Sequence, residues 1–430
     1  MEKFIIKGCE PLIGEITPAG NKNSALPLLA ACLLTKEPVI LKNVPQIEDV
    51  AVMRLLIESL GAVVEELEPT TWKIHAEDIN LVNLDPELVK KIRASILLVG
   101  PLVAREGELF LTPPGGDVIG RRRVDTHFLA IRSLGATAEY NFDAKKFHFK
   151  TENGLIGADI LLDEASVTAT ENTIMASVLA KGETYIRNAA SEPHIQELCQ
   201  MLSSMGANIE HIGSNILKII GVESLSGTEF TIGPDYLEVV SYIGAAVMTG
   251  GEIRIKNAGP QYLHMVKLVF NRLGIDWIDE GEDIFIPRDQ KKVIEADLGN
   301  AIPEIKVMPW PAFPPDLMSI AIVVATQCKG SILFHDWMYN SRMFFTDKLV
   351  AMGAQIVLCD PHRVIVQGPT KLIGETMDSP DIRAGMALVL AALAAKGESE
   401  IRNISQIKRG YERVYEKLKK LGANISVETD

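Results

Sequence analysis

The sequence lacks an apolar run long enough to cross a lipid bilayer. Its longest apolar run, AGMALVLAALAA at residues 384–395, has about 12 residues, whereas a membrane-spanning helix needs about 20. The first residues, MEKFIIKGCE, also lack the apolar segment and the small-residue cleavage site of a signal peptide. We therefore expect a cytoplasmic protein that has no membrane partner.

Cysteine is scarce, and the short motifs of metal and nucleotide chemistry are missing. The five cysteines are scattered and none has CxxC spacing, which disfavours disulfides and zinc sites. The sequence has no HExxH, GxGxxG, Walker or GxSxG motif, so metal ligation, nicotinamide chemistry and serine acyl transfer are disfavoured. We expect no metal and no cofactor. Cys32 and Cys328 lie in apolar stretches and are predicted to be core residues.

Positive charge is the minority sign, with 43 Lys and Arg against 56 Asp and Glu and a net charge of −13. This balance argues against nucleic acid or an anionic membrane as a partner. Within this acidic chain, the segment PGGDVIGRRRVD at residues 114–125 carries three consecutive arginines after a glycine-rich stretch that predicts a loop. A cluster of cations next to the carboxylate of Asp117 favours a site for a small anion.

One pattern recurs six times along the 430 residues. Segments such as LIESLGAVVEE, AIRSLGATAEY and LKKLGANISV combine the end of an amphipathic helix, a glycine and an alternating strand. The six glycines are at positions 61, 135, 206, 274, 353 and 422. Because glycine just after a helix favours a left-handed cap, we predict such a cap at each position.

A second pattern has nearly the same period: a polar start, an apolar helix and a strand, as in PDIRAGMALVLAALAAKGESEI. These helices are apolar nearly all round and are predicted to be buried. Their predicted starts lie near residues 23, 93, 166, 235, 316 and 381. Six units of about 70 residues favour two similar domains of three units each, with a break near residue 232. Spacing alone leaves open which domain contains the N-terminal strand KFIIKG.

Polar residues stand at the predicted helix starts. If all six helices point the same way, their N-termini meet in a cleft between the domains, where the helix dipoles favour anions. Ser166, Asp235 and Asp381 have an alternative role at these starts as ordinary helix caps.

Capping does not explain the cations at the other helix starts, because a cation opposes the helix dipole. Lys22, Arg93 and Arg383 are therefore candidate functional residues. We add Arg409, which precedes GY at a predicted loop-to-helix junction in KRGYERVYEKL. The neighbouring lysines in both segments fit a solvated surface.

Several segments resemble the enolpyruvyl transferase family: AGNKNSALPLLAACLL, RASILLVGPLVAR, PGGDVIGRRRVDTH, PAFPPDLMS, NSRM and KRGYERVYEKLKKLGA. GNKNSAL and RGYERVYEKL resemble its UDP-N-acetylglucosamine branch, and the resemblance runs along the whole chain. It implies an α/β fold with two domains, an inside-out α/β barrel of six βαβαββ repeats. Residues 22–232 would form the first domain, with the catalytic loop, and residues 1–21 plus 233–430 the second. The active site would lie in the cleft between them.

The resemblance implies transfer of the enolpyruvyl group of phosphoenolpyruvate to the 3′-hydroxyl of UDP-N-acetylglucosamine, with release of phosphate, at the start of peptidoglycan synthesis. It implies that Lys22, Arg122 and Arg409 hold phosphoenolpyruvate. It also implies that Asn23 and Asp316 grip the sugar and that Asp316 is the base for the hydroxyl. We expect a monomer in solution with these two small-molecule substrates as partners.

Further substrate-binding residues follow from the same resemblance. Arg93 would lie beside the diphosphate, and Asp381 and Arg383 around the reacting phosphate. The UDP portion would contact Arg123, Val124, Asp125, His127, Ser166, Val167 and Thr168. Met338 and Arg342 complete the implied substrate-binding set.

The sequence departs from the family at Asp117, where most members have cysteine in the loop. The resemblance makes Asp117 the acid that protonates the methylene carbon. An ordinary aspartate has a pKa of about 3.9 and is ionised at neutral pH, unlike a cysteine with a pKa of about 8.5. We therefore expect Asp117 to become an acid only in the closed complex with both substrates. Because a carboxylate is a poorer nucleophile than a thiolate, we also expect insensitivity to the epoxide fosfomycin, which alkylates the family's cysteine.

Other departures concern the acceptor. His194 and Asn340 stand where the family has carboxylates, Arg123 where proline is common, and Glu164 where a lysine that faces UDP is common. Two alternatives therefore stay open. The first is an enolpyruvyl transferase for shikimate 3-phosphate or another nucleotide sugar. The second is a non-catalytic paralogue that binds a UDP-sugar.

Overall fold

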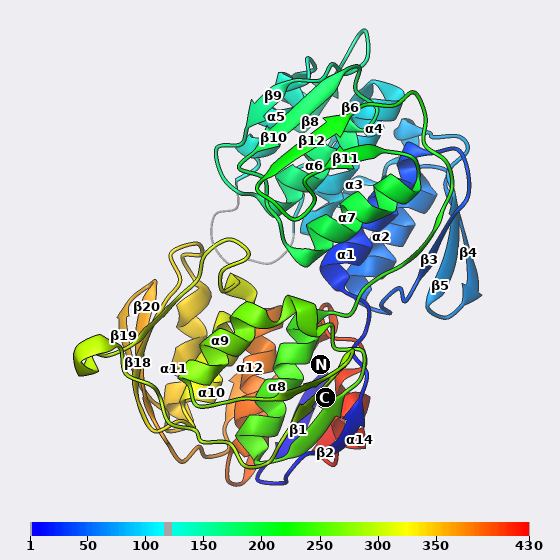
Figure 1. Ribbon diagram of the computed structural model, residues 1–430. Coiled ribbons are helices and arrows are strands. Elements are labelled where there is room, and N and C mark those ends of the chain that lie inside the picture. Colours follow the sequence, from blue (N-terminus) through cyan, green and yellow to red (C-terminus); the bar gives the residue numbers. More distant parts are fainter. Residues whose placement is uncertain (1, 116–122, 430) are drawn as a thin grey trace. The chain divides into compact units, whose positions relative to one another are not determined.

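The computed structural model describes residues 2–115 and 123–429 (Figure 1). The chain forms two compact units. We call residues 20–115 and 123–233 the N-terminal unit, and residues 2–19 and 234–429 the C-terminal unit. Asp117 and Arg122, both predicted site residues, lie outside the described residues.

Each unit contains three β-sheets among its described residues. Those of the N-terminal unit are β13-β3-β5-β4 (Glu229–Thr231, Val39–Lys42, Thr71–His75, Val63–Glu68), β6-β8-β7 (Glu108–Leu111, Lys146–Lys150, Thr137–Asn141) and β11-β12-β10-β9 (Asn208–Glu210, Ile216–Ile220, Glu183–Arg187, Asp159–Leu161). Those of the C-terminal unit are β21-β22-β1-β23 (Thr376–Asp378, Glu398–Arg402, Glu2–Lys7, Asn424–Thr429), β15-β16-β14-β2 (Ile278–Glu280, Asp283–Ile286, Glu252–Ile255, Ile13–Ile16) and β17-β18-β20-β19 (Glu304–Lys306, Gly330–His335, Arg363–Gly368, Gln355–Asp360).

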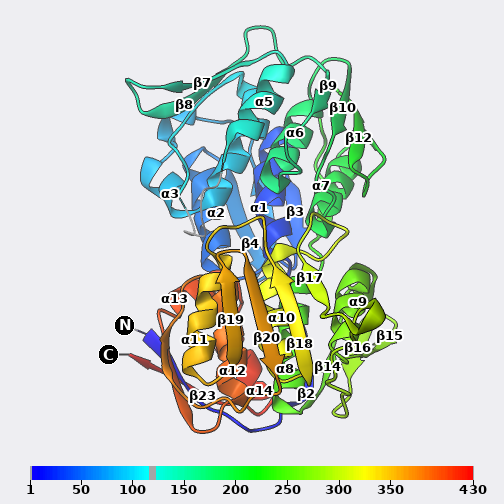
Figure 2. The same ribbon diagram turned by 90° about the vertical axis from the view of Figure 1, so that its left-hand side faces the viewer.

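Five of these sheets share one topology, in which a parallel edge strand is followed by antiparallel pairs. The parallel pairs are β9 with β10, β13 with β3, β2 with β14, β17 with β18 and β21 with β22. Figure 2 shows β18, β20 and β19 side by side in one such sheet. The N-terminal strand β1 pairs antiparallel with both β22 and β23, so the strand whose place spacing left open lies in the C-terminal unit.

Each unit contains three buried helices in the part of the chain that the structure describes. In the N-terminal unit these are α1 (Lys22–Ala31), α4 (Val99–Glu106) and α6 (Val167–Ser177), and in the C-terminal unit α8 (Tyr236–Thr249), α10 (Met318–Ala325) and α12 (Ile382–Ala394). Further helices are α2 (Glu48–Ser59), α3 (Pro86–Lys91), α5 (Asp125–Ser133), α7 (Pro193–Ser204), α9 (His264–Arg272), α11 (Thr346–Ala351), α13 (Ser405–Lys408) and α14 (Val414–Lys420). No helix in the described ranges has the length and apolarity that spanning a membrane requires.

Two of the six helix starts differ from the simple pattern. The segments expected to begin near residues 93 and 316 open with 3₁₀ turns, η3 (Arg93–Leu98) and η6 (Pro315–Leu317), before α4 and α10 begin. Pro101 explains the first turn, because it has no N–H for the carbonyl of Leu97 and its ring disfavours an α-turn there.

The predicted glycine caps are confirmed. The glycines at 61, 135, 206, 274, 353 and 422 all have φ between 74° and 106°, a region in which other residues are strained. Cys32 and Cys328 are also confirmed as core residues, with 1% and 0% exposure.

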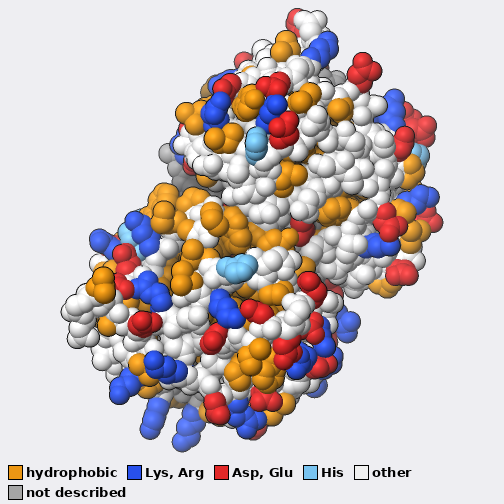
Figure 3. Space-filling model, viewed as in Figure 1, with side chains coloured by type: hydrophobic (Ala, Val, Ile, Leu, Met, Phe, Trp, Pro, Cys, Tyr) orange, Lys and Arg blue, Asp and Glu red, His pale blue; other side chains and the backbone are white. Residues whose placement is uncertain are grey.

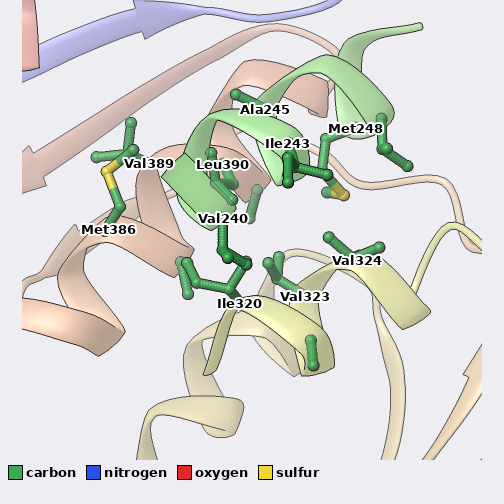
Figure 4. Packing of buried hydrophobic residues seen from close by; sticks show 14 of the residues in the cluster. Val240, Ile243, Ala245, Met248, Ile320, Val323, Val324, Met386, Val389 and Leu390 are labelled. Carbon is green, nitrogen blue, oxygen red and sulfur yellow. The ribbon is translucent and has the colours of Figure 1, made fainter. Parts of the chain in front are cut away.

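The core of the C-terminal unit is a three-helix contact among α8, α10 and α12. Figure 4 shows Val240 and Ile243 of α8 packed with Ile320 of α10 and Leu390 of α12. Gly244 permits this approach, because a Cβ there would lie 2.8 Å from Leu390 Cδ1. Burial of each such aliphatic side chain contributes about 1.5–3 kcal/mol. The three helices are therefore held against one another by close packing of their side chains.

Candidate active site

Lys22 and Asp49 form a buried ion pair in the N-terminal unit. Lys22 is the first residue of α1, Asp49 lies in the first turn of α2, and their exposed fractions are 7% and 6%. Lys22 Nζ is 2.6 Å from Asp49 Oδ2. The carboxylate offsets the unfavourable position of a cation at a helix start, and the N-terminus of α2 favours the carboxylate in turn. The preceding residue Asn21 caps α1 by accepting a hydrogen bond from the backbone N–H of Asn23.

The turn before α5 brings together several residues predicted to bind UDP. Arg93 donates to the carbonyl of Arg123 at 2.9 Å. Arg123 donates to Asp125 at 3.1 Å and to Asp163 at 3.2 Å. The hydroxyl of Thr126 donates to the other oxygen of Asp163 at 2.6 Å. Asp163 thus stabilises the turn through hydrogen bonds to both Arg123 and Thr126.

The start of α6 lies next to this turn. Ser166 is its N-cap residue but makes no side-chain capping bond, so the alternative role of Ser166 as an ordinary cap is wrong. Val167 is the first helical residue, and the next residue, Thr168, contacts His127. His127 itself is buried, with 1% exposure. Val124 is the residue that precedes α5.

In the C-terminal unit, Asp316 lies between two buried arginines. Its Oδ1 accepts from Arg342 Nη2 at 3.0 Å, and its Oδ2 is 3.4 Å from Arg383 Nε. The exposed fractions of Arg342 and Arg383 are 3% and 6%, whereas about a third of the Asp316 side chain is exposed. Burial opposes the charge of Arg342, but Asp316 and Asp381 outweigh it and raise the pKa of Arg342.

Each of these arginines has a further buried partner. The guanidinium of Arg342 lies 3.9 Å from Asp336 Oδ2, and Asp336 is fully buried. The guanidinium of Arg383 lies 5.3 Å from the ring centroid of Tyr411, whose hydroxyl is 3.0 Å from Ser241 Oγ. Burial raises the pKa of Asp336, while Arg342 opposes that rise. Both guanidinium groups are therefore held in place by buried neighbours in addition to Asp316.

The remaining predicted residues of this unit lie on neighbouring loops and helix starts. Asp381 caps α12, because its Oδ1 accepts from the backbone N–H groups of Arg383 and the next residue. Asp235 caps α8 in the same way, so the capping role is confirmed at both acids. The backbone N–H of Met338 donates to Asp336, and Arg409 donates to Gln406 at 3.1 Å.

The comparison with known proteins decides the family. A family model described as EPSP synthase (3-phosphoshikimate 1-carboxyvinyltransferase) matches residues 6–418. A UDP-N-acetylglucosamine 1-carboxyvinyltransferase of Treponema denticola is 53% identical over 99% of both chains. A protein of the same name from Bradyrhizobium diazoefficiens is 54% identical over 98% of this chain and 97% of its own. The chain belongs to the UDP-N-acetylglucosamine 1-carboxyvinyltransferase family.

Solved structures confirm the predicted enolpyruvyl transferase fold. The enolpyruvyl transferase NikO from Streptomyces tendae has a TM-score of 0.89 at 24% identity, and covers 100% of this chain and 99% of its own. An EPSP synthase from Acinetobacter baumannii has a TM-score of 0.75 at 17% identity over 100% of both chains. One prediction about the repeats needs a correction: in the described residues, the sheet β6-β8-β7 has three strands where the other five sheets have four.

Sequence reasoning missed four buried or bridging polar residues of this family member. Asp49, Asp163, Asn172 and Asp336 each contact a predicted site residue. Only Asn172 had a signal in the sequence, because it lies in the polar run TENT within a helix predicted to be buried. Of the residues that depart from the family, His194 is buried in α7. Glu164 and Asn340 are exposed and lie in loops.

Charge is mixed on the face of the molecule that Figure 3 shows. Acidic and basic side chains are interspersed over the face that Figure 3 shows, without one extended basic field. In residues 2–115 and 123–429, no group of three or more His, Cys, Asp or Glu side chains has a geometry that could hold a metal ion.

Proposed function

We propose that the protein transfers the enolpyruvyl group of phosphoenolpyruvate to the 3′-hydroxyl of UDP-N-acetylglucosamine and releases phosphate. This would be the first committed step of peptidoglycan synthesis. The observation that carries the proposal is the identity of 53% and 54% over nearly the full length with two relatives named for this activity. We further propose that the protein acts as a cytoplasmic monomer.

The first step of the reaction forms a tetrahedral ketal. The 3′-oxygen bonds to C2 of phosphoenolpyruvate while C3 gains a proton and the hydroxyl loses one. Asp316 is the proposed acceptor of the hydroxyl proton. The ion pairs of its carboxylate with Arg342 and Arg383 support this assignment, because they fix the position of both carboxylate oxygens. Asp117 is the proposed donor to C3, by resemblance alone.

The second step breaks the bond between C2 and the bridging oxygen. Phosphate leaves with that oxygen, and C3 loses a proton to restore the double bond. The charge that develops on phosphate favours fixed cations, and we assign Lys22, Arg122 and Arg409 to this role. The pair of Lys22 with Asp49 supports the assignment of Lys22, because it fixes the position of the ammonium at the start of α1.

The remaining assignments concern the acceptor. We propose that Asn23 and Asp316 contact the sugar and that Arg93 lies beside the diphosphate. We place the UDP portion at the turn before α5 and the start of α6, where Arg123 and Thr168 lie. Backbone N–H groups at a helix start favour phosphate oxygens, which supports this placement.

Release of phosphate from phosphoenolpyruvate, measured with each of two acceptors, tests the proposal. We expect release with UDP-N-acetylglucosamine and none with shikimate 3-phosphate. Release with shikimate 3-phosphate alone would favour the activity that names the matched family model. Binding of UDP-N-acetylglucosamine without phosphate release at any pH would indicate a non-catalytic paralogue.

A further inference from the structure

A chain of buried hydrogen bonds runs behind the start of α6. Asn172, in the second turn of α6, has 0% exposure, and His127 of α5 has 1%. Their side chains meet at 2.8 Å between Asn172 Nδ2 and His127 Nδ1. The other ring nitrogen, His127 Nε2, lies 3.1 Å from Thr168 Oγ1. Helices α5 and α6 lie side by side in Figure 2.

Two backbone groups of the neighbouring segment fix the orientation of the Asn172 amide. The N–H of Gly100 lies 2.7 Å from Asn172 Oδ1, and a backbone N–H can only donate. The carbonyl of Ile96 lies 2.8 Å from Asn172 Nδ2, and a carbonyl can only accept. Both contacts require the amide oxygen to face Gly100 and the amide nitrogen to face Ile96 and His127.

This orientation determines the tautomer of His127. One proton of Asn172 Nδ2 is used by Ile96, so the second points at His127 Nδ1, which must then be an unprotonated acceptor. The ring proton is therefore on Nε2 and is donated to Thr168 Oγ1. Burial, followed by the positive charge of Arg93, lowers the pKa of His127 to about 3, so the ring stays neutral at physiological pH.

The hydroxyl of Thr168 is left with a proton to donate. Its oxygen already accepts from His127, and in the described part of the chain no other hydrogen-bond partner of Thr168 Oγ1 is found. Thr168 is half-buried at the second position of α6, where Ser166 provides no side-chain cap. Backbone N–H groups at a helix start also attract anions.

We propose that Asn172 and His127 are positioning residues, which fix the hydroxyl of Thr168 as a hydrogen-bond donor to the diphosphate of the UDP-sugar. This inference rests on the proposed function for its ligand. His127, which the resemblance placed among the substrate contacts, acts through Thr168 because its ring is fully enclosed. The same hydroxyl in the opposite orientation would present lone pairs and repel a phosphate oxygen.

The tautomer can be measured without any ligand. Long-range proton–nitrogen correlation spectra of protein that contains isotope-labelled histidine distinguish the two neutral tautomers and the imidazolium ion, and His127→Gln assigns the signal. We expect the Nε2–H tautomer of His127 from pH 5 to pH 8. An Nδ1–H tautomer, or an imidazolium ion in this range, would overturn the inference.

The ligand contact is tested by calorimetric titration with UDP-N-acetylglucosamine, UDP and uridine. Thr168→Val removes the hydroxyl at constant shape and should weaken UDP-N-acetylglucosamine and UDP by roughly tenfold to hundredfold, because a hydrogen bond to a charged group is lost. Uridine, which has no phosphate, should bind the variant and the wild type equally. Thr168→Ser keeps the donor and should recover most of the affinity. Thr173→Val is the matched control, because that hydroxyl donates within α6 to Ala169.

Asn172→Asp tests the relay itself. A carboxylate can only accept, so the ring proton should move to Nδ1 and the hydroxyl of Thr168 should turn towards Nε2. We expect the reversed tautomer together with the affinity loss of Thr168→Val. An unchanged affinity in Thr168→Val or a persistent Nε2–H tautomer in folded Asn172→Asp would contradict the relay. Failure of the wild type to bind any UDP compound would instead contradict the proposed function, and the ligand-free spectra would still report the tautomer.

Discussion

The buried histidine gives the folding stability of the N-terminal unit a specific pH dependence. The pKa of His127 is lowered from 6.5 to about 3 in the folded chain. Between these values the unfolded chain binds a proton that the folded chain does not. The contribution to stability is therefore complete above pH 6.5 and is lost as the pH falls towards 3.

The expected size follows from the shift. A pH of about 5 lies about 1.5 units below the pKa of the unfolded histidine. Each of these pH units lowers the unfolding free energy by about 1.4 kcal/mol. The wild type should therefore lose about 2 kcal/mol more unfolding free energy between about pH 7.5 and about pH 5 than His127→Gln, which has no titrating ring. Other titrating groups are common to both proteins and cancel in the difference.

Buried thiols allow each unit to be followed separately. Cys32 and Cys199 are buried in the N-terminal unit and Cys328 in the C-terminal unit. Pulsed thiol labelling in increasing urea, with mass spectrometry of the three peptides, gives the midpoint for each unit. The pH dependence at Cys328 should be the same in both proteins. If the unfolding midpoints at Cys32 and Cys199 depend on pH equally in the wild type and in His127→Gln, a neutral buried histidine is refuted.

Three further predictions concern the proposed chemistry. Asp49→Ala should destabilise the N-terminal unit by about 3–5 kcal/mol in urea unfolding, because it leaves the buried charge of Lys22 uncompensated. The double variant Lys22→Met/Asp49→Leu should recover most of this stability but remain inactive. Equal stability of the wild type and Asp49→Ala would contradict the ion pair. Asp316→Asn should lower kcat by roughly 10²–10⁴-fold in the phosphate-release assay with a smaller change in KM, as expected for loss of a general base, and an unaltered kcat would exclude that role. Asp117→Cys should move the pH optimum of phosphate release upward and introduce time-dependent inactivation by fosfomycin, with the adduct on the loop. An unchanged pH profile would count against Asp117 as the acid. A fosfomycin adduct on the wild-type loop would contradict the expected insensitivity.

The repeat pattern in the sequence predicted the buried helices and their caps because both depend on local chemistry. The glycines at 61 and 422, for example, follow amphipathic helices and adopt the left-handed conformation that other residues avoid. The 3₁₀ turns before α4 and α10 were missed, because periodicity does not separate a 3₁₀ turn from the first turn of an α-helix. The sequence also could not predict which strands pair with β13 and β2, because their partners β3 and β14 are far away in the sequence.

The sequence predicts a site residue where the residue type is unusual for its structural position. It does not predict the partners that only the fold brings to that residue. Lys22 can be identified from the sequence as a candidate, because a cation at a helix start opposes the helix dipole. Its partner Asp49 is 27 residues later in an ordinary acidic first turn, which carries no signal of its own. Asp336 and Asp163 were missed for the same reason, because only the fold brings them to Arg342 and Arg123. For Asn172 the polar run in α6 was visible, but its contact with His127 depends on helix packing.

The most direct test of the proposed reaction follows the bridging oxygen of phosphoenolpyruvate. With a heavy-oxygen label at that position, cleavage between C2 and oxygen places the label in phosphate, and cleavage between phosphorus and oxygen leaves it in pyruvate. The account predicts that phosphate release depends on UDP-N-acetylglucosamine, that all the label leaves in phosphate, and that the sugar product contains none. Label in pyruvate, or release that does not need the UDP-sugar, would contradict enolpyruvyl transfer as the function of this protein.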